Sequence, residues 1–141
     1  MRLLLPILLL LPLSLWGQQI EETTRREARK SEGAVLVLRA AEHDFGTVDR
    51  RGGDLCYELT FTNEGTTPLV LMRVITSCSC LKSEFSKRPI PPGGVGKITL
   101  SYQPLKAEPG TFHKVVQILS NSQTGRELFT IRGNSVDHKN K

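Results

Sequence analysis

The feature that most constrains this chain is a strict two-residue alternation between Leu55 and Thr62. The apolar positions of this segment are Leu55, Tyr57, Leu59 and Phe61. The positions between them are Cys56 and polar side chains. A period of two is typical of a β-strand that buries one face and exposes the other. The alternation therefore predicts a half-buried strand, with Cys56 on the face opposite to the apolar residues.

Short apolar segments of the same kind recur along the chain and are separated by turn residues. They cover residues 34–39, 43–48, 68–75, 98–102, 112–119 and 128–133. The turns between them are rich in Gly, Pro and Asn, as in Asn63-Glu64-Gly65 and Pro91-Pro92-Gly93-Gly94. No segment after residue 33 has convincing helical spacing. About seven strands in about 100 residues predict an all-β, immunoglobulin-like antiparallel β-sandwich.

The first 17 residues have the pattern of a signal peptide. Met1-Arg2 places one positive charge before an apolar stretch of 14 residues, Leu3 to Trp16, which contains two prolines. A membrane-spanning helix needs about 20 apolar residues, so an uncleaved anchor is the weaker alternative. We expect cleavage between Gly17 and Gln18, export to the periplasm or the outside of the cell, and no transmembrane segment after cleavage.

The remaining chain divides into three parts. Residues 18–33 are predicted to be a flexible polar leader, residues 34–136 the β-sandwich and residues 137–141 a polar tail. The net charge of +5 arises from 19 Lys and Arg against 14 Asp and Glu, and no run holds the excess. We therefore expect no nucleic-acid partner, because a basic patch with interleaved aromatic residues is missing.

The pair Cys78 and Cys80 has the clearest chemical potential. Two thiolates at this spacing can hold a soft cation such as Cu(I), and Met72, His43 or His113 can add a ligand if the fold brings them near. A structural zinc site is not expected, because it needs four ligands. No other cofactor is predicted.

Disulfide formation is the alternative fate of the cysteines in an oxidising compartment. Cys78 and Cys80 can close a small ring that is easily reduced and suits thiol exchange. Cys56 can instead pair with Cys78 or Cys80 as a structural brace, remain free, or pair with another chain. The spacing alone does not choose among these pairings.

No catalytic residues are expected, and we do not expect an enzyme. His43 and Asp44 are neighbours on a predicted strand, so their side chains point to opposite faces, and no Gly-x-Ser-x-Gly nucleophile motif is present. The segment Pro92 to Lys97 does not fit a phosphate-binding loop, because Ile98 stands where Ser or Thr is required. Its glycines fit a turn that needs positive φ.

Taken together, the turns and strands resemble a known family. The segments that carry the resemblance are Asp44-Phe45-Gly46-Thr47-Val48, Phe61-Thr62-Asn63-Glu64-Gly65, Pro68-Leu69-Val70-Leu71, Ser77-Cys78-Ser79-Cys80, Pro91-Pro92-Gly93-Gly94, Ile98-Thr99-Leu100-Ser101-Tyr102, Ser120-Asn121 and Ile131-Arg132-Gly133. They are similar to the secreted bacterial family catalogued as domain of unknown function fifteen seventy-three, itself similar to hydin and major-sperm-protein domains. The resemblance implies an exported β-sandwich and brings no catalytic residues. Cys56 departs from the family pattern.

Three functions are compatible with these patterns. The leading hypothesis is an exported, non-enzymatic protein-interaction or structural module with a protein partner. The second is a Cu(I) carrier or sensor that uses Cys78 and Cys80. The third is a thiol–disulfide exchange protein that uses the same pair.

Overall fold

The structure is a computed structural model that describes residues 32–138. The predicted signal peptide (1–17), nearly all of the predicted leader (18–33) and the last three residues of the predicted tail lie outside the described residues. The strands of the described chain run from Leu36 to Val136. Its one helical element is the short 3-10 turn Pro104–Lys106.

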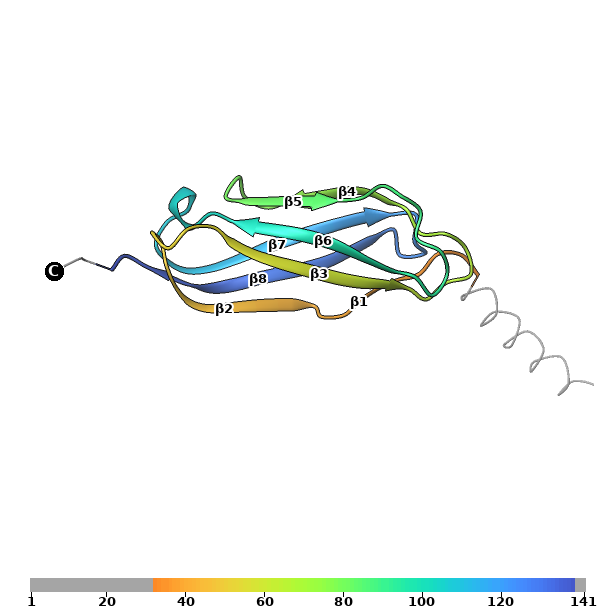
Figure 1. Cartoon of the computed structure of the whole chain (residues 1–141), viewed down its shortest axis with the longest axis horizontal. Helices are drawn as coiled ribbons and strands as arrows, with labels where there is room; N and C mark the ends of the chain where they lie inside the picture. The colour runs from red at the N-terminus through yellow and green to blue at the C-terminus, as the bar shows by residue number, and fades with distance from the viewer. Residues whose placement is uncertain (1–31, 139–141) are drawn as a thin grey trace, which may run out of the picture. The chain divides into compact units, whose positions relative to one another are not determined.

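Eight strands form two four-stranded sheets that pack face to face (Figure 1). In chain order they are β1 (Leu36–Leu38), β2 (Glu42–Asp49), β3 (Leu55–Asn63), β4 (Leu71–Thr76), β5 (Leu81–Phe85), β6 (Val95–Tyr102), β7 (Gly110–Ser120) and β8 (Arg126–Val136). One sheet has the order β1-β3-β6-β5 and the other β2-β8-β7-β4. This confirms the predicted all-β, immunoglobulin-like sandwich.

Two details differ from the expectation. We predicted about seven strands, and the structure adds β5, in which Leu81, Ser83 and Phe85 alternate with the charged residues Lys82 and Glu84. The pairing is also not wholly antiparallel, since β2 runs parallel to β8. The parallel pair arises because β1, which pairs with β3, is short. The chain then crosses to the other sheet, where β2 lies beside the last strand, β8.

The core lies between the two sheets and follows the predicted alternation. Leu59 and Phe61 of β3 are buried, whereas Cys56 and Glu58 between the inward positions are exposed. The facing sheet contributes buried side chains from β7 and β8, among them Phe129. Burial of this apolar surface is the main stabilising contribution to such a sandwich.

Asn63 fixes the turn that follows β3. Its side chain is fully buried and accepts hydrogen bonds from the backbone N–H groups of Val35 (3.2 Å) and Gly65 (3.0 Å). It donates to the carbonyl oxygens of Thr67 (2.9 Å) and Ile90 (3.0 Å). One side chain therefore ties the start of β1, the β3–β4 turn and the loop before β6 together.

Candidate functional site

The structure brings Cys78 and Cys80 together as a disulfide. The two residues lie in the connection between β4 and β5, with their Cα atoms 5.1 Å apart. Among the pairings that the sequence leaves open, the structure therefore contains the one that closes the small ring. A bridge from Cys56 to either residue is not the pairing that the structure contains. The reason is positional, because Cys56 points outward from β3 and Cys80 points into the core.

The two sulfur-bearing residues differ in their surroundings. Cys80 is completely buried in the core, whereas Cys78 is half-buried and keeps part of its surface accessible. The backbone N–H of Cys80 donates a hydrogen bond to Sγ of Cys78 at 3.1 Å. The ring therefore joins one residue that keeps accessible surface to one that is fully buried.

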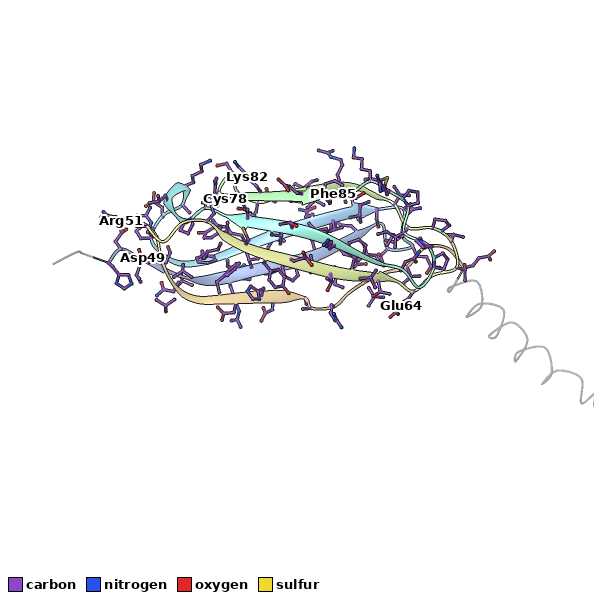
Figure 2. The ribbon with its side chains drawn as sticks, in the orientation of Figure 1. Asp49, Arg51, Glu64, Cys78, Lys82 and Phe85 are labelled. Carbon is purple, nitrogen blue, oxygen red and sulfur yellow. A yellow bond between two sulfur atoms is a disulfide. The ribbon has the colours of Figure 1, made fainter. Side chains whose placement is uncertain are left out.

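Hydrogen bonds that do not involve the disulfide hold the connection in place. The N–H of Gln103 donates to the carbonyl of Cys80 at 2.7 Å, and the N–H of Leu81 donates to the carbonyl of Cys78 at 3.2 Å. Ser77 exchanges two hydrogen bonds with the backbone of Val115, through its N–H (3.2 Å) and its Oγ (3.1 Å). Figure 2 shows Cys78 at the end of the sandwich that also carries Asp49 and Arg51, opposite the end with Glu64.

Cys56 lies in a different environment. It is an exposed residue of β3 with no disulfide partner in the described chain. It is paired with Ser101 of β6, which is paired in turn with Lys82 of β5, and the three side chains share the outer face of their sheet. Cys56 is therefore separate from the Cys78–Cys80 ring.

The residues suggested as extra metal ligands are spread over the sandwich. His43 stacks against Tyr57, His113 is exposed on β7, and Met72 is an exposed residue of β4. Within residues 32–138, no group of three or more His, Cys, Asp or Glu side chains is placed to hold a metal ion. The Cu(I) hypothesis therefore concerns two thiolates that exist only after the disulfide is reduced.

His43 and Asp44 point to opposite faces of β2, as the strand periodicity predicted. His43 faces the other sheet, whereas Asp44 lies on the outer face with its Oδ2 3.6 Å from a guanidinium nitrogen of Arg132. The same guanidinium nitrogen is 3.1 Å from a carboxylate oxygen of Glu42. The two residues do not form a catalytic pair.

An open pocket of about 270 Å³ lies on the outer face of the second sheet, where β2 has a register shift between Asp44 and Thr47. The residues that line it include Thr111, Arg132 and Asn134. The guanidinium of Arg132 is already neutralised by two carboxylates, so the pocket lacks the free charge that would bind an anion. We assign it no ligand.

The second candidate site is an unpaired stretch of β3. On one side β3 pairs with β6 along its length, but on the other side β1 pairs only with residues 61–63. The last bond on that side runs from the N–H of Arg39 to the carbonyl of Thr60 at 3.1 Å. Because backbone groups alternate in direction, the N–H and C=O groups of Cys56 and Glu58 point to the same side as those of Thr60. No described strand pairs with them there. We call residues 55–59 the open segment of β3.

Half-buried aromatic side chains line the inner side of the open segment. The ring of His43 stacks on Tyr57 with centroids 4.0 Å apart, and Phe45 meets His43 edge to face at 4.6 Å. Tyr57 also stacks on the buried Phe129, with centroids 5.6 Å apart. The open segment therefore combines unpaired backbone groups with an apolar floor, which is the combination that an added strand requires.

The two-sheet architecture places the molecule among immunoglobulin-like β-sandwich domains. Residues 36–135 match the family described as protein of unknown function (DUF1573), and the chain belongs to that family. No curated protein matches the sequence. No helix within residues 32–138 has the length and apolar character needed to span a membrane.

Solved structures with the same fold come from diverse proteins. A Porphyromonas gingivalis protein of unknown function is 22% identical with a TM-score of 0.65; the match covers 74% of this chain and 48% of that one. PapD-like domain 7 of human CEP192 is 12% identical, with a TM-score of 0.61 and coverages of 76% and 89%. The secreted serine protease VesC from Vibrio cholerae is 21% identical, with a TM-score of 0.56 and coverages of 75% and 24%. The present chain thus spans about half of the Porphyromonas protein and a quarter of VesC.

Sequence reasoning located Cys78 and Cys80 but missed the open segment of β3. The alternation of β3 was visible, yet whether its backbone is paired depends on which strands flank it and how far they extend. No local signal marks the end of β1, because Arg39-Ala40-Ala41 after Leu38 is not a turn pattern, yet β1 stops there before it can cover the first half of β3.

Proposed function

We propose that this domain is an exported, non-enzymatic module that binds an extended segment of a partner protein along the open segment of β3. The carrying observation is that the N–H and C=O groups of Cys56 and Glu58 have no paired strand among the described residues. An extended chain laid antiparallel to β3 would continue the line of β1 and satisfy these groups.

The aromatic floor gives such a partner its side-chain preference. Every second residue of an added strand points toward the interior, so the inward residues of the partner would contact Tyr57, His43 and Phe45. These rings are half-buried, and covering them removes apolar surface from water. The partner segment is therefore expected to alternate apolar and polar residues, with the apolar residues facing the sandwich.

The outer face of the open segment adds a weak charge preference. Glu58 forms an ion pair with Lys97 of β6. The Nζ of Lys97 lies 3.5 Å from the carboxylate of Glu58, and both side chains are well exposed. Exposed pairs of this kind contribute little to affinity. Backbone pairing and the aromatic floor, rather than charge, are proposed to determine binding.

Site-specific photo-crosslinking in the native exported fraction tests this proposal. A photo-reactive amino acid replaces exposed Arg39, which lies where β1 ends and the added strand begins. With the label at Arg39, we expect a covalent adduct with a partner. This adduct should be absent when the label replaces exposed His113 on the other sheet. In the Arg39-labelled protein, Glu58→Pro should reduce the yield of the adduct at least tenfold, because proline lacks the N–H that donates a hydrogen bond to the partner strand.

Glu58→Ala is the matched control for this experiment, since it removes the carboxylate and keeps the N–H. It should leave the adduct within about twofold, in line with the small contribution of an exposed ion pair. An adduct that survives Glu58→Pro, or the absence of any adduct at Arg39, would overturn strand addition at this edge.

Export is a separate part of the proposal. The predicted signal peptide supports it, and an oxidised cysteine pair fits an oxidising compartment. Cell fractionation with intact-mass analysis tests export, with a chain starting at Gln18 as the expected product. Recovery of the full-length chain from the cytoplasm contradicts this part alone.

Cu(I) binding by the reduced pair is the alternative function. Two thiolates at positions 78 and 80 would supply soft ligands. We expect such binding to need prior reduction and to be lost in both Cys78→Ser and Cys80→Ser. A Cu(I) titration of the reduced Cys56→Ser protein against a competing chelator decides it, and no binding above that of the double serine variant excludes the carrier function.

A further inference from the structure

We infer that the Cys78–Cys80 disulfide is an exchange site that oxidises cysteine thiols of another exported polypeptide, with Cys78 as the attacked sulfur and Cys80 as the leaving group. This function goes beyond partner binding at β3 and does not depend on it. The inference rests on three features of the connection between β4 and β5: unequal burial, one hydrogen bond to sulfur, and independent support of the turn.

Unequal burial assigns the two roles. Thiol–disulfide exchange requires an incoming thiolate to reach one of the two sulfur atoms. Cys80 has no exposed surface, whereas Cys78 is only half-buried. An incoming thiolate therefore attacks Sγ of Cys78. The leaving sulfur is Sγ of Cys80, which lies on the core side of the ring.

The hydrogen bond to Cys78 stabilises the reduced form. The N–H of Cys80 lies 3.1 Å from Sγ of Cys78 in the oxidised state. When the ring opens, the same N–H can donate to the Cys78 thiolate, and hydrogen bonds to an ionised acceptor are the stronger kind. Stabilising the reduced form makes a disulfide a better oxidant of other thiols.

The disulfide contributes little as a structural brace. Its ring closes across only one intervening residue, Ser79, and the stabilisation from a cross-link falls as the closed loop shortens. The connection is already held by backbone hydrogen bonds of Leu81 to Cys78 and of Gln103 to Cys80. The two sulfur atoms therefore stay close in both redox states, which allows the ring to open and close without rearrangement of the fold.

The reaction balances as a two-electron exchange. A substrate thiolate attacks Sγ of Cys78, the Cys78–Cys80 bond breaks, and Cys80 leaves as a thiolate that takes up a proton. A second substrate thiol, deprotonated to its thiolate, then attacks the substrate sulfur of the mixed disulfide, and Cys78 leaves as a thiolate that also takes up a proton. The substrate loses two electrons and two protons and becomes a disulfide, while Cys78 and Cys80 become a dithiol.

Glutathione is the probe for the test. Every protein that keeps Cys78 or Cys80 carries Cys56→Ser, so that the third cysteine does not react. The native oxidised domain is exposed to reduced glutathione, quenched with acid and mapped by mass spectrometry. We expect ring opening in the folded domain and a mixed disulfide at Cys78, with none at Cys80.

Variants with one remaining cysteine measure the two sulfur atoms separately. With oxidised glutathione, the Cys78 thiol of Cys80→Ser should react at least tenfold faster than the Cys80 thiol of Cys78→Ser. The wild-type residue Cys56, studied in Cys78→Ser plus Cys80→Ser, provides an exposed thiol that lacks the Cys80 amide. Cys78 should react faster than this reference at neutral pH. Circular dichroism confirms that each variant is folded.

Three results overturn the inference. The first is a native disulfide that glutathione opens only after the domain is unfolded, and this result needs no variant at positions 78 or 80. The second is a mixed disulfide located on Cys80. The third is a Cys78 thiol no more reactive than Cys56, because the hydrogen bond to sulfur would then have no chemical effect.

Discussion

The imidazole of His43 stacks on the phenol ring of Tyr57, with centroids 4.0 Å apart and an interplanar angle of 18°. The two residues belong to strands of different sheets, β2 and β3, so the stack joins the sheets at the edge of the sandwich. It lies on the inner side of the open segment of β3, where no described strand continues the line of β1. Side chains of the two sheets therefore contact each other at this edge, whereas the backbone groups of the open segment have no paired strand among the described residues. The proposed binding mode rests on this combination.

Replacing Glu58 by proline tests whether the backbone of the open segment is unpaired. Glu58→Pro should change the free energy of unfolding by no more than about 1 kcal/mol, because proline is tolerated where a strand N–H has no partner. Its neighbour Thr99 is the matched control. Thr99 lies next to Glu58 on the same outer face, but it pairs with Glu84 of β5 on its other side.

Thr99→Pro should cost at least about 2 kcal/mol, because it removes a hydrogen bond inside the sheet. Urea denaturation of both variants gives the comparison. Equal losses of stability at the two positions would show that the N–H of Glu58 is bonded in the isolated domain, contrary to our description of the edge.

Removing the side chain of Asn63 should destabilise the domain by about 2–4 kcal/mol, because its loss removes a buried amide and leaves four partly buried backbone groups without this partner. Asn121→Ala is the matched control. That side chain accepts from the N–H of Val70 at 2.8 Å and donates to the carbonyl of Pro68 at 3.0 Å, but it is exposed. Water can replace those bonds, so we expect a loss of about 1 kcal/mol or less. Chemical denaturation of both variants measures the difference, and an Asn63→Ala loss as small as that of Asn121→Ala would contradict the role of the buried amide.

Reducing the Cys78–Cys80 disulfide should lower the free energy of unfolding by no more than about 2 kcal/mol, because a very short loop loses little entropy on closure. The measurement compares oxidised and reduced Cys56→Ser protein in urea. A loss well above that figure would identify the bridge as a structural brace and weaken the exchange function.

Tyr102 predicts a stability change at high pH. Burial raises the pKa of its phenol above the ordinary value of 10.0, and the positive charge of Arg50 opposes this only in part. Above pH 10.0 the unfolded state loses the proton and the folded state keeps it, so folding becomes less favourable as the pH rises. Below the ordinary value both states are protonated, and Tyr102 adds no pH dependence.

Tyr102→Phe should therefore reduce the loss of stability above pH 10.0 relative to wild type. Because the buried hydroxyl has no hydrogen-bond partner among the described residues, its removal should cost about 1 kcal/mol or less at pH 7. Thermal unfolding followed between pH 7 and the alkaline range provides the test. Parallel pH profiles for the two proteins would contradict the assignment to Tyr102.

The sequence was sufficient to predict the fold class because alternation and turn residues are local signals. Leu59 and Phe61 point inward as the alternation indicated, and Asn63 ends the strand where the turn was expected. The strand β5 was not predicted, because the charged residues Lys82 and Glu84 indicate a solvated segment. Leu81 and Phe85 nevertheless follow the two-residue period of a half-buried strand.

The candidate sites were predictable only in part, because they depend on contacts between distant segments. The spacing of Cys78 and Cys80 suggested a ring but left the pairings of Cys56 open. Only the orientation of each residue in the fold distinguishes the pairings. The open segment of β3 depends on where β1 stops and on the crossing to β2, neither of which a pattern within one strand reveals.

Residue-resolved amide hydrogen exchange of the isolated domain tests the central claim most directly. The N–H groups of Cys56 and Glu58 point to the open edge, and those of Tyr57 and Leu59 point to β6. We predict that Cys56 and Glu58 exchange at least about 100-fold faster than their two neighbours, because only the latter are held in the sheet. Equal protection of all four amides would contradict an open edge on β3 and, with it, the proposed binding of a partner strand.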